Sequence, residues 1–164
     1  MYQEFGLFID NAWRSARGEK TVEVIDPATE DVLGAVPRAA GADLDDALAA
    51  ASRATKSWAA TAGWARSKIL RRIAAKVESR GERIACAISA ETGKPIAEAR
   101  GETAAAIDQF DWYADEARRV FGHTLDGRDP SVRLEVRYQP VGPLRPSPPG
   151  ISRPCCPPAR SRRR

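Results

Sequence analysis

Long apolar runs, cysteine and histidine are all scarce in this sequence. Its 164 residues include three cysteines and one histidine, and no apolar run approaches the roughly 20 residues that a membrane-spanning helix needs. Few cysteines exclude a disulfide scaffold, and 43% apolar with 29% charged residues is the ordinary composition of about one soluble domain. The first residues show no basic leader typical of a signal peptide. We therefore expect a cytoplasmic protein without a membrane contact.

The sequence also lacks the short motifs that bind phosphates, dinucleotides or metals. It has no Gly-x-Gly-x-x-Gly, no phosphate loop ending in Gly-Lys-Ser/Thr, no His-Glu-x-x-His and no Cys-x-x-Cys. Cys86 lies in an apolar stretch, where we expect a small buried side chain rather than a nucleophile. The single histidine, His123, follows a predicted helix, so we expect it to be exposed or to cap that helix. No catalytic, cofactor-binding or metal-binding residue is predicted.

Charged side chains of the predicted helices are interpreted as solvated faces. Glu91, Glu98 and Glu102 recur at helical spacing opposite the apolar positions, so exposure to water explains them better than acid–base chemistry. The sequence also holds two arginine pairs, Arg71-Arg72 and Arg118-Arg119. Asp115 and Glu116 lie just before Arg118-Arg119. No row of exposed aromatic residues accompanies Arg71-Arg72. We therefore expect no specific nucleic-acid binding by this part of the chain.

The net charge of +4 arises at the C-terminal end of the chain. Residues 145–164 hold six arginines, six prolines and no acidic residue, which leaves 20 basic against 22 acidic residues in residues 1–144. The same segment contains Cys155 and Cys156, which as neighbours are poorly placed to share one metal ion. Dense proline and like charges without hydrophobic periodicity predict a disordered tail over residues 145–164. A basic contact to nucleic acid or a membrane is the alternative interpretation of this tail.

Two hydrophobic periods organise residues 1–144. Alternating apolar residues predict strands, and three-to-four spacing predicts three amphipathic helices. Asp43 is the expected N-cap of the first helix, the second relaxes near Gly81, and Gly122 ends the third. In chain order, the predicted elements are strands at 7–13, 21–25 and 32–36, helices at 43–58, 69–93 and 103–121, and a long strand at 132–138. Strands segregated from helices predict an α+β fold or a piece of a larger one.

Five short segments resemble the opening of the aldehyde dehydrogenase superfamily. In order along the chain they are residues 7–13 (LFIDNAW), 24–29 (VIDPAT), 91–95 (ETGKP), 112–117 (WYADEA) and 139–143 (QPVGP). Within the superfamily they look most like bacterial succinate-semialdehyde dehydrogenases. The resemblance implies an α+β fragment of the α/β aldehyde dehydrogenase fold. Such enzymes oxidise an aldehyde to a carboxylic acid with NAD or NADP, through a covalent thiohemiacetal on a cysteine.

The resemblance also implies that the catalytic machinery is encoded further along a chain several-fold longer. The catalytic cysteine, the glutamate base and most of the cofactor-binding sheet have no counterpart in residues 1–144. We therefore expect a truncated dehydrogenase that is inactive and binds no cofactor by itself. Homologous subunits are its expected partners, through exposed apolar helix faces and the strand at 132–138. The alternative function is a helical interaction module that docks on a full-length homologue.

The tail is explained by a change of reading frame after Leu144. In the family, the Gln-Pro-Val-Gly segment leads into Pro-Trp-Asn-Phe-Pro, whose asparagine helps to form the oxyanion hole. Residues 150–153 read Gly-Ile-Ser-Arg, which can be encoded as GGA ATT TCC CGG. With the preceding T of the Pro149 codon, the same bases regroup as TGG AAT TTC CCG and encode Trp-Asn-Phe-Pro. Shifted reading of GC-rich codons also yields many arginine and proline triplets, as residues 145–164 show.

This interpretation predicts the nucleotide sequence of the gene. Insertion of a single base directly after the Leu144 codon is expected to restore a long reading frame that encodes Trp-Asn-Phe-Pro shortly afterwards. Resequencing of the gene, together with the intact mass of the cellular protein, tests this. If no single-base insertion after codon 144 opens a long frame, the interpretation is wrong.

Overall fold

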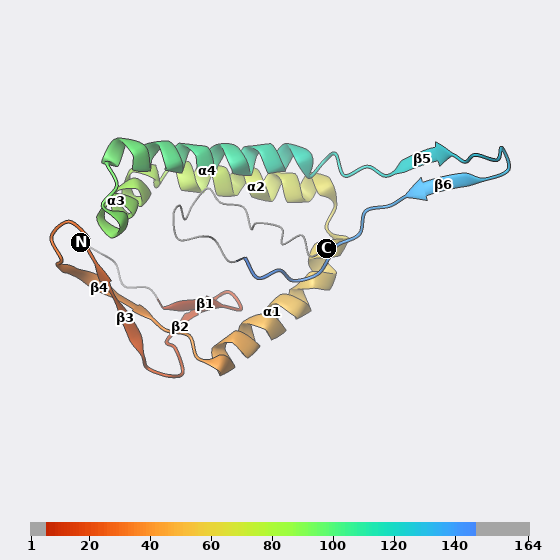
Figure 1. Cartoon of the computed structure of the whole chain (residues 1–164). Coiled ribbons are helices and arrows are strands. Elements are labelled where there is room, and N and C mark those ends of the chain that lie inside the picture. The colour runs from red at the N-terminus through yellow and green to blue at the C-terminus, as the bar shows by residue number, and fades with distance from the viewer. Residues whose placement is uncertain (1–5, 147–164) are drawn as a thin grey trace.

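A computed structural model describes residues 6–146 of the chain. Within this range the elements are β1 (Leu7–Ile9), β2 (Ala12–Arg14), β3 (Thr21–Ile25), β4 (Val32–Pro37), α1 (Gly41–Ala60), α2 (Gly63–Glu78), α3 (Gly81–Thr92), α4 (Ile96–Glu116), β5 (His123–Asp126) and β6 (Arg133–Val136). The α+β class predicted from the sequence is confirmed (Figure 1). From residue 147 onward, the tail that was predicted to be disordered lies outside the described residues. No helix within residues 6–146 is long and apolar enough to cross a membrane.

The N-terminal strands form two separate antiparallel hairpins. The stretch predicted as one strand over residues 7–13 is the β1–β2 hairpin, in which Phe8 is paired with Trp13. Its turn residues Asp10 and Asn11 have φ values of 54° and 62°, the left-handed conformation that a two-residue hairpin turn requires and that Asp and Asn tolerate. The predicted strands at 21–25 and 32–36 are confirmed as β3 and β4, which pair with each other.

Asp43 stabilises the start of α1 from inside the helix. The N-cap is Ala40 rather than the predicted Asp43. Asp43 lies three residues later, is 1% exposed, and its Oδ2 accepts hydrogen bonds from the backbone N–H groups of Ala40 (2.9 Å) and Arg17 (3.2 Å). One turn on, Asp46 accepts from Arg14 (2.9 Å) and Arg17 (2.6 Å), and these bonds lower its pKa. The carboxylates thus join α1 to the end of β2 and to the segment that follows it.

The second predicted helix is two helices. Arg80 leaves the helical conformation (φ −116°, ψ 7°), so α2 ends at Glu78 and α3 begins at Gly81. The predicted relaxation near Gly81 is thus a break between two helices, which the sequence did not reveal because both segments carry the same apolar period. The predicted stop is confirmed: Gly93 caps α3 with φ 68°, and a Cβ there would lie only 3.0 Å from Pro27 Cγ.

The third predicted helix begins and ends earlier than its apolar pattern. It corresponds to α4, which begins at Ile96 rather than Thr103 and ends at Glu116 instead of reaching Gly122. Phe121, the last residue of the predicted helix, lies outside α4 and is 66% exposed. The chain turns after Glu116, where Arg118 and Arg119 reach back to carboxylates of the last helical turn. The helix therefore ends where side chains can bond to its own last turn, six residues before Gly122.

The strand predicted over residues 132–138 is a short arm of a hairpin. Only Arg133–Val136 is a strand, β6, and it pairs with β5, which the sequence pattern did not reveal. All residues of both strands are exposed, including Leu134 (50%) and Val136 (40%) of the apolar face. Figure 1 shows the reason, since this hairpin extends away from the helices.

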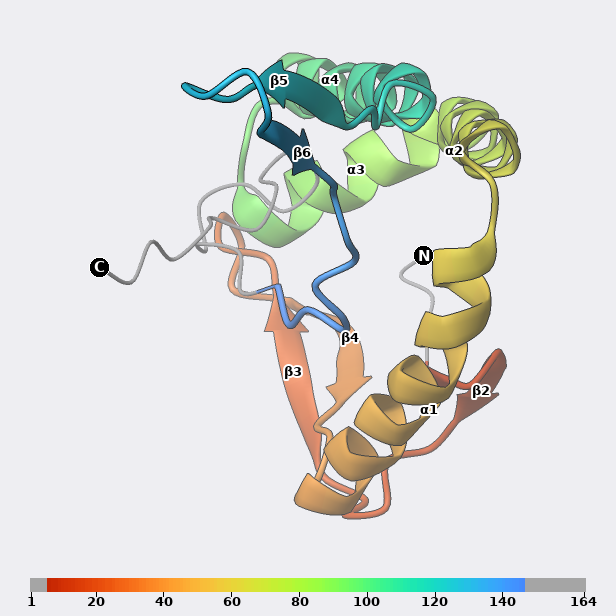
Figure 2. The same ribbon diagram turned by 90° about the vertical axis from the view of Figure 1, so that its right-hand side faces the viewer.

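Small residues form the only fully buried core of the described chain. In both views α2 and α4 lie side by side with α3 at one end, while α1 and the β3–β4 hairpin stand apart (Figures 1 and 2). The buried apolar residues are all alanines: Ala16, Ala74, Ala85, Ala99, Ala106 and Ala114. Among the large apolar side chains, those of Trp64 and Trp112 are each 67% exposed. The largest apolar side chains are thus still in contact with water.

An aromatic and ionic cluster fastens the end of α4 to the start of α2. The Arg118 guanidinium lies 5.0 Å from the ring centroid of Trp64, a favourable cation–π arrangement. Arg118 also donates to Asp115, which accepts a second hydrogen bond from Arg71 of α2 at 2.7 Å. The bond from Arg118, supported by the charge of Arg71, holds the pKa of Asp115 below its usual value.

The exposed apolar surface predicts weak cooperativity. Because each large apolar side chain contributes about 1.5–3 kcal/mol only when it is fully buried, the chain alone is expected to unfold over a broad range of urea concentration. It is also expected to bind a dye that reports exposed apolar surface. Circular dichroism and dye fluorescence in a urea series measure both. A steep transition together with dye binding no stronger than that of a compact protein of the same mass would contradict this expectation.

The lowered pKa of Asp115 predicts a loss of stability in acid. A carboxyl group whose pKa is lower in the folded chain stabilises it above the ordinary carboxyl value of about 4, and this contribution disappears as the pH falls below that value. Asp115→Asn is expected to lower the midpoint of urea unfolding at neutral pH and to reduce its further decrease at about pH 3.5. Asp108→Asn is the matched control, since Asp108 is exposed on α4 and forms no ion pair within residues 6–146. Equal effects of the two substitutions would show that the cluster does not fasten α2 to α4.

Candidate functional site

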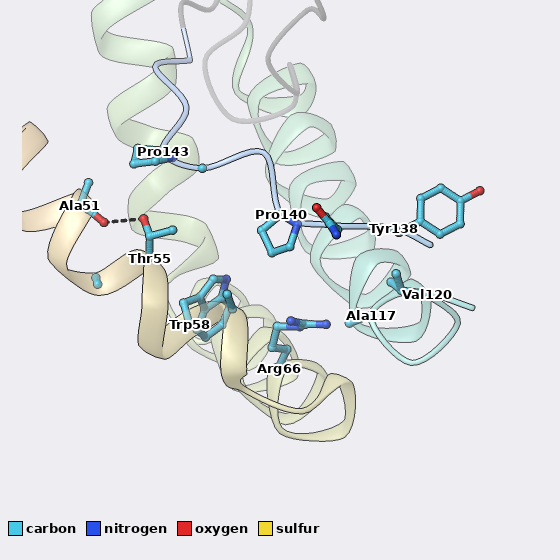
Figure 3. Close-up of a pocket in the computed structure, with 13 residues that line it drawn as sticks. Ala51, Thr55, Trp58, Arg66, Ala117, Val120, Tyr138, Pro140 and Pro143 are labelled. Carbon is cyan, nitrogen blue, oxygen red and sulfur yellow. Dashed lines mark hydrogen bonds between the residues drawn. The ribbon is translucent and has the colours of Figure 1, made fainter. Parts of the chain in front are cut away.

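A crevice lies between α1, the start of α2, the end of α4 and the segment after β6. Its volume is about 690 Å³, and Figure 3 shows the segment around Pro140 and Pro143 facing the part of α1 that carries Thr55 and Trp58. It is lined by Ala51, Ala54, Thr55, Trp58, Ala59, Arg66, Ala117, Val120, Tyr138, Gln139, Pro140, Gly142 and Pro143. The apolar stripe predicted for the first helix, which included Thr55 and Trp58, supplies one wall. The opposite wall is one of the segments that resemble the aldehyde dehydrogenases.

The residues that line the crevice are suited to binding a partner and not to catalysing a reaction. Arg66 is its only charged side chain, and no carboxylate, thiol or imidazole lines it. The Thr55 hydroxyl donates to the Ala51 carbonyl at 2.8 Å (Figure 3), so its proton is already used within α1. Binding sites for small molecules combine apolar walls with several convergent polar groups. Here the walls are present and the convergent groups are not, which favours a partner surface of protein.

Arg66 was not predicted as a site residue, because a single arginine at the start of a helix carries no distinguishing pattern. Arg66 is half-buried, and no ion pair within residues 6–146 includes it. Figure 3 shows it beneath Pro140, between Trp58 and the end of α4. The crevice therefore has one unpaired cation in an otherwise neutral wall.

Cys86 is exposed, contrary to the prediction that it is buried. Its neighbour Ala85 takes the buried position with 0% exposure, because α3 packs against α4 too closely for a larger side chain. The Cys86 thiol lies 3.9 Å from Glu82 Oε1, but Glu82 accepts two hydrogen bonds from Arg100, at 2.6 and 3.0 Å. These bonds lower the pKa of Glu82, so this carboxylate is a poor base for the thiol.

His123 is exposed, as predicted, but it does not cap a helix. It is the first residue of β5, and its ring lies edge-on to Tyr138 with 6.5 Å between the centroids. Since α3 and β5 lie at opposite ends of the helical layer (Figure 1), the structure does not bring His123 to Cys86. The described residues therefore contain no thiol–imidazole pair for nucleophilic catalysis.

The three glutamates differ in environment. Glu98 is exposed, as predicted. Glu102 is not part of a solvated face: its side chain is 16% exposed and bonds to Lys94, 20% exposed, with 2.7 Å between Nζ and Oε2. Glu91 is half-buried. The Lys94–Glu102 pair joins the turn after α3 to α4, and its eight-residue separation is outside the spacings that a helical pattern can reveal.

Three of the four arginines in the two arginine pairs bond to carboxylates, and Arg72 is the exception within residues 6–146. Arg71 lies 2.7 Å from Asp115 and 3.6 Å from Asp111, and Arg119 lies 3.2 Å from Glu116. Over residues 6–146, no cluster of histidine, cysteine and acidic side chains could hold a metal ion.

The described residues do not fit a dinucleotide. Dinucleotides bind at the carboxyl edge of a parallel sheet, where a glycine-rich turn precedes a helix. Residues 6–146 form three two-stranded antiparallel sheets and contain no such crossover. No step of a reaction with NAD or NADP can therefore be assigned to these residues.

Comparison with known proteins establishes the family. The aldehyde dehydrogenase family model matches residues 13–145. The chain is 38% identical to a glutarate-semialdehyde dehydrogenase of Pseudomonas putida over 135 residues, 82% of this chain and 28% of that protein. It is 34% identical to the NADP(+) succinate-semialdehyde dehydrogenase of Escherichia coli over 134 residues, 82% and 28% of the two chains.

Solved structures show the same relationship. The crystal structure of succinate-semialdehyde dehydrogenase from Burkholderia pseudomallei superimposes with a TM-score of 0.70 and 39% identity, over 74% of this chain and 25% of that one. The chain thus spans little more than a quarter of the relatives that it matches. The resemblance in the five short segments is confirmed, and the chain belongs to the aldehyde dehydrogenase family.

Proposed function

We propose that this chain is the amino-terminal part of an NAD(P)-dependent semialdehyde dehydrogenase and that the 164-residue polypeptide does not oxidise an aldehyde by itself. The observation that carries the proposal is the 38% identity to a glutarate-semialdehyde dehydrogenase of which the chain covers 28%. The E. coli relative is a succinate-semialdehyde dehydrogenase. Both names describe an aldehyde that carries a second, acidic end, so the proposed substrate class is an ω-carboxylated aldehyde.

The chemistry of aldehyde oxidation supports the second half of the proposal. The reaction needs a nucleophile that adds to the carbonyl carbon, donors that stabilise the resulting oxyanion, and a nicotinamide that accepts the hydride. Cys86 is the only thiol within residues 6–146. Its carboxylate neighbour is engaged by Arg100, so no base is positioned to activate it.

The role left to residues 6–146 is to support a larger enzyme. The crevice beside Trp58 and Arg66 and the exposed tryptophans are surfaces that the remaining part of a family domain would cover. Contacts to homologous subunits through the helix faces and residues 132–138 are part of the same proposal. The interaction-module alternative gains no support from the comparisons, since the relatives named above are dehydrogenases.

The proposal includes an out-of-frame origin for residues 145–164. The family model matches up to residue 145. The proposed shift of frame follows Leu144, so the match ends one residue after the proposed shift. The arginine and proline excess begins at the same place. Both observations support a shift of frame after Leu144.

A chimaera tests the proposed function. Residues 1–144 are fused to the P. putida relative in place of its aligned N-terminal part, and semialdehyde-dependent formation of NAD(P)H is followed by absorbance. The chimaera is expected to oxidise glutarate or succinate semialdehyde at least about a thousandfold faster than the 164-residue chain, because only the chimaera contains a nucleophile and a hydride acceptor site.

Two controls make the result decisive. The same chimaera with the catalytic cysteine of the donor part replaced by alanine is expected to be inactive, which excludes a contaminating dehydrogenase. Circular dichroism and size-exclusion chromatography establish whether the chimaera is folded. Clear activity of the 164-residue chain alone, or a folded chimaera that oxidises neither semialdehyde, would overturn the proposal.

A further inference from the structure

A second concavity, of about 430 Å³, lies on α2 and the start of α3. It is lined by Ile69, Arg72, Ile73, Lys76, Val77, Arg80 and Ile84. We call it the α2–α3 groove. Its residues separate by chemistry into an aliphatic floor and a row of cations.

The aliphatic floor follows the axis of α2. Ile69, Ile73 and Val77 recur at four-residue spacing and cover about 12 Å of helix length at 1.5 Å per residue; Ile84 of α3 extends the floor. Ile73 is 37% exposed, and the other three are partly exposed. An apolar groove of this length accepts two to three turns of a second helix.

The cations beside this floor have no carboxylate partners. Arg72, Lys76 and Arg80 are exposed and also follow one another at four-residue spacing. No ion pair within residues 6–146 includes any of them. Elsewhere on the helices, Arg71 and Arg100 both pair with carboxylates. Three cations in a row without a partner create a positive potential along one side of the groove.

We propose that the α2–α3 groove binds an acidic amphipathic helix of a partner protein. The partner would insert apolar side chains between Ile69 and Ile84 and place carboxylates beside Arg72, Lys76 and Arg80. A nucleic acid fits less well, since its phosphates gain nothing from an aliphatic floor and the groove has no aromatic side chain for a base to stack on. A lipid surface fits less well because the aliphatic side chains lie in a concavity. The proposal does not depend on the proposed dehydrogenase function.

Fluorescence anisotropy with a synthetic probe tests the proposal on the full chain. The probe is a labelled peptide of about 16 residues, with leucines at i, i+3, i+4 and i+7 and glutamates on both sides of that stripe. Two control peptides replace every glutamate by lysine, or shuffle the order of the same residues. The glutamate peptide is expected to bind at least about tenfold more tightly than either control, and more weakly as the salt concentration rises.

Charge reversal in the groove and outside it locates the binding. Arg72→Glu with Lys76→Glu is expected to weaken binding of the glutamate peptide at least about tenfold. Lys56→Glu with Arg128→Glu changes the net charge equally at exposed positions outside the groove and is expected to leave binding unchanged. Circular dichroism establishes that both variants keep the helices.

The remaining outcomes overturn the proposal. Absence of binding by the glutamate peptide, equal binding of the lysine or shuffled peptide, or equal loss in the two double variants would each do so. Binding to phosphatidylserine vesicles without binding of the peptide would assign the groove to a lipid surface instead. Peptide binding that survives charge reversal in the groove would place the peptide elsewhere on the chain.

Discussion

The close approach of α2 and α4 determines where the other apolar side chains of the chain can lie. The buried positions on α2 are Ser67 and Ala74, and those on α4 include Thr103, Ala106 and Ala114. Small residues let two helix axes come near each other, but each of them removes little apolar area from water. The larger apolar residues of both helices therefore point to other surfaces, and the helical layer has faces that need a partner.

Two of these faces differ in charge, and this difference bears on what can cover them. The crevice beside Trp58 has a single charged residue, Arg66, so an uncharged and closely fitting protein surface suits it. The α2–α3 groove has three unpaired cations beside an aliphatic floor, so a partner without carboxylates would leave those charges uncompensated at the contact. The same helix thus contributes to two surfaces of different specificity.

Hydrophobic periodicity in the sequence was sufficient to predict the type and order of most elements. It did not predict burial where the distance between packed elements determines which side chain fits. Cys86 and Ala85 are both small and apolar, yet only alanine fits where α3 meets α4. Glu102 is held by Lys94 across a turn, a contact that no short spacing encodes. β6 carries an alternating pattern, but the β5–β6 hairpin pairs with no further strand and neither of its faces is buried, so alternation alone did not indicate burial. The crevice could be predicted only in part, through the apolar stripe of α1.

Ion pairs between elements take the place that large apolar contacts occupy in a compact domain. Arg14 and Arg17 join α1 to the β2 segment, Arg71 joins α2 to α4, and Arg100 joins α4 to α3. Exposed ion pairs typically contribute about 0–1 kcal/mol each, far less than a buried isoleucine or tryptophan. Such pairs specify how the elements are oriented but add little to the free energy of unfolding. Because the ion pairs orient the helices without covering their apolar faces, those faces have a defined geometry that a partner can bind. This explains why exposed tryptophans and a well-defined arrangement of helices occur in the same chain.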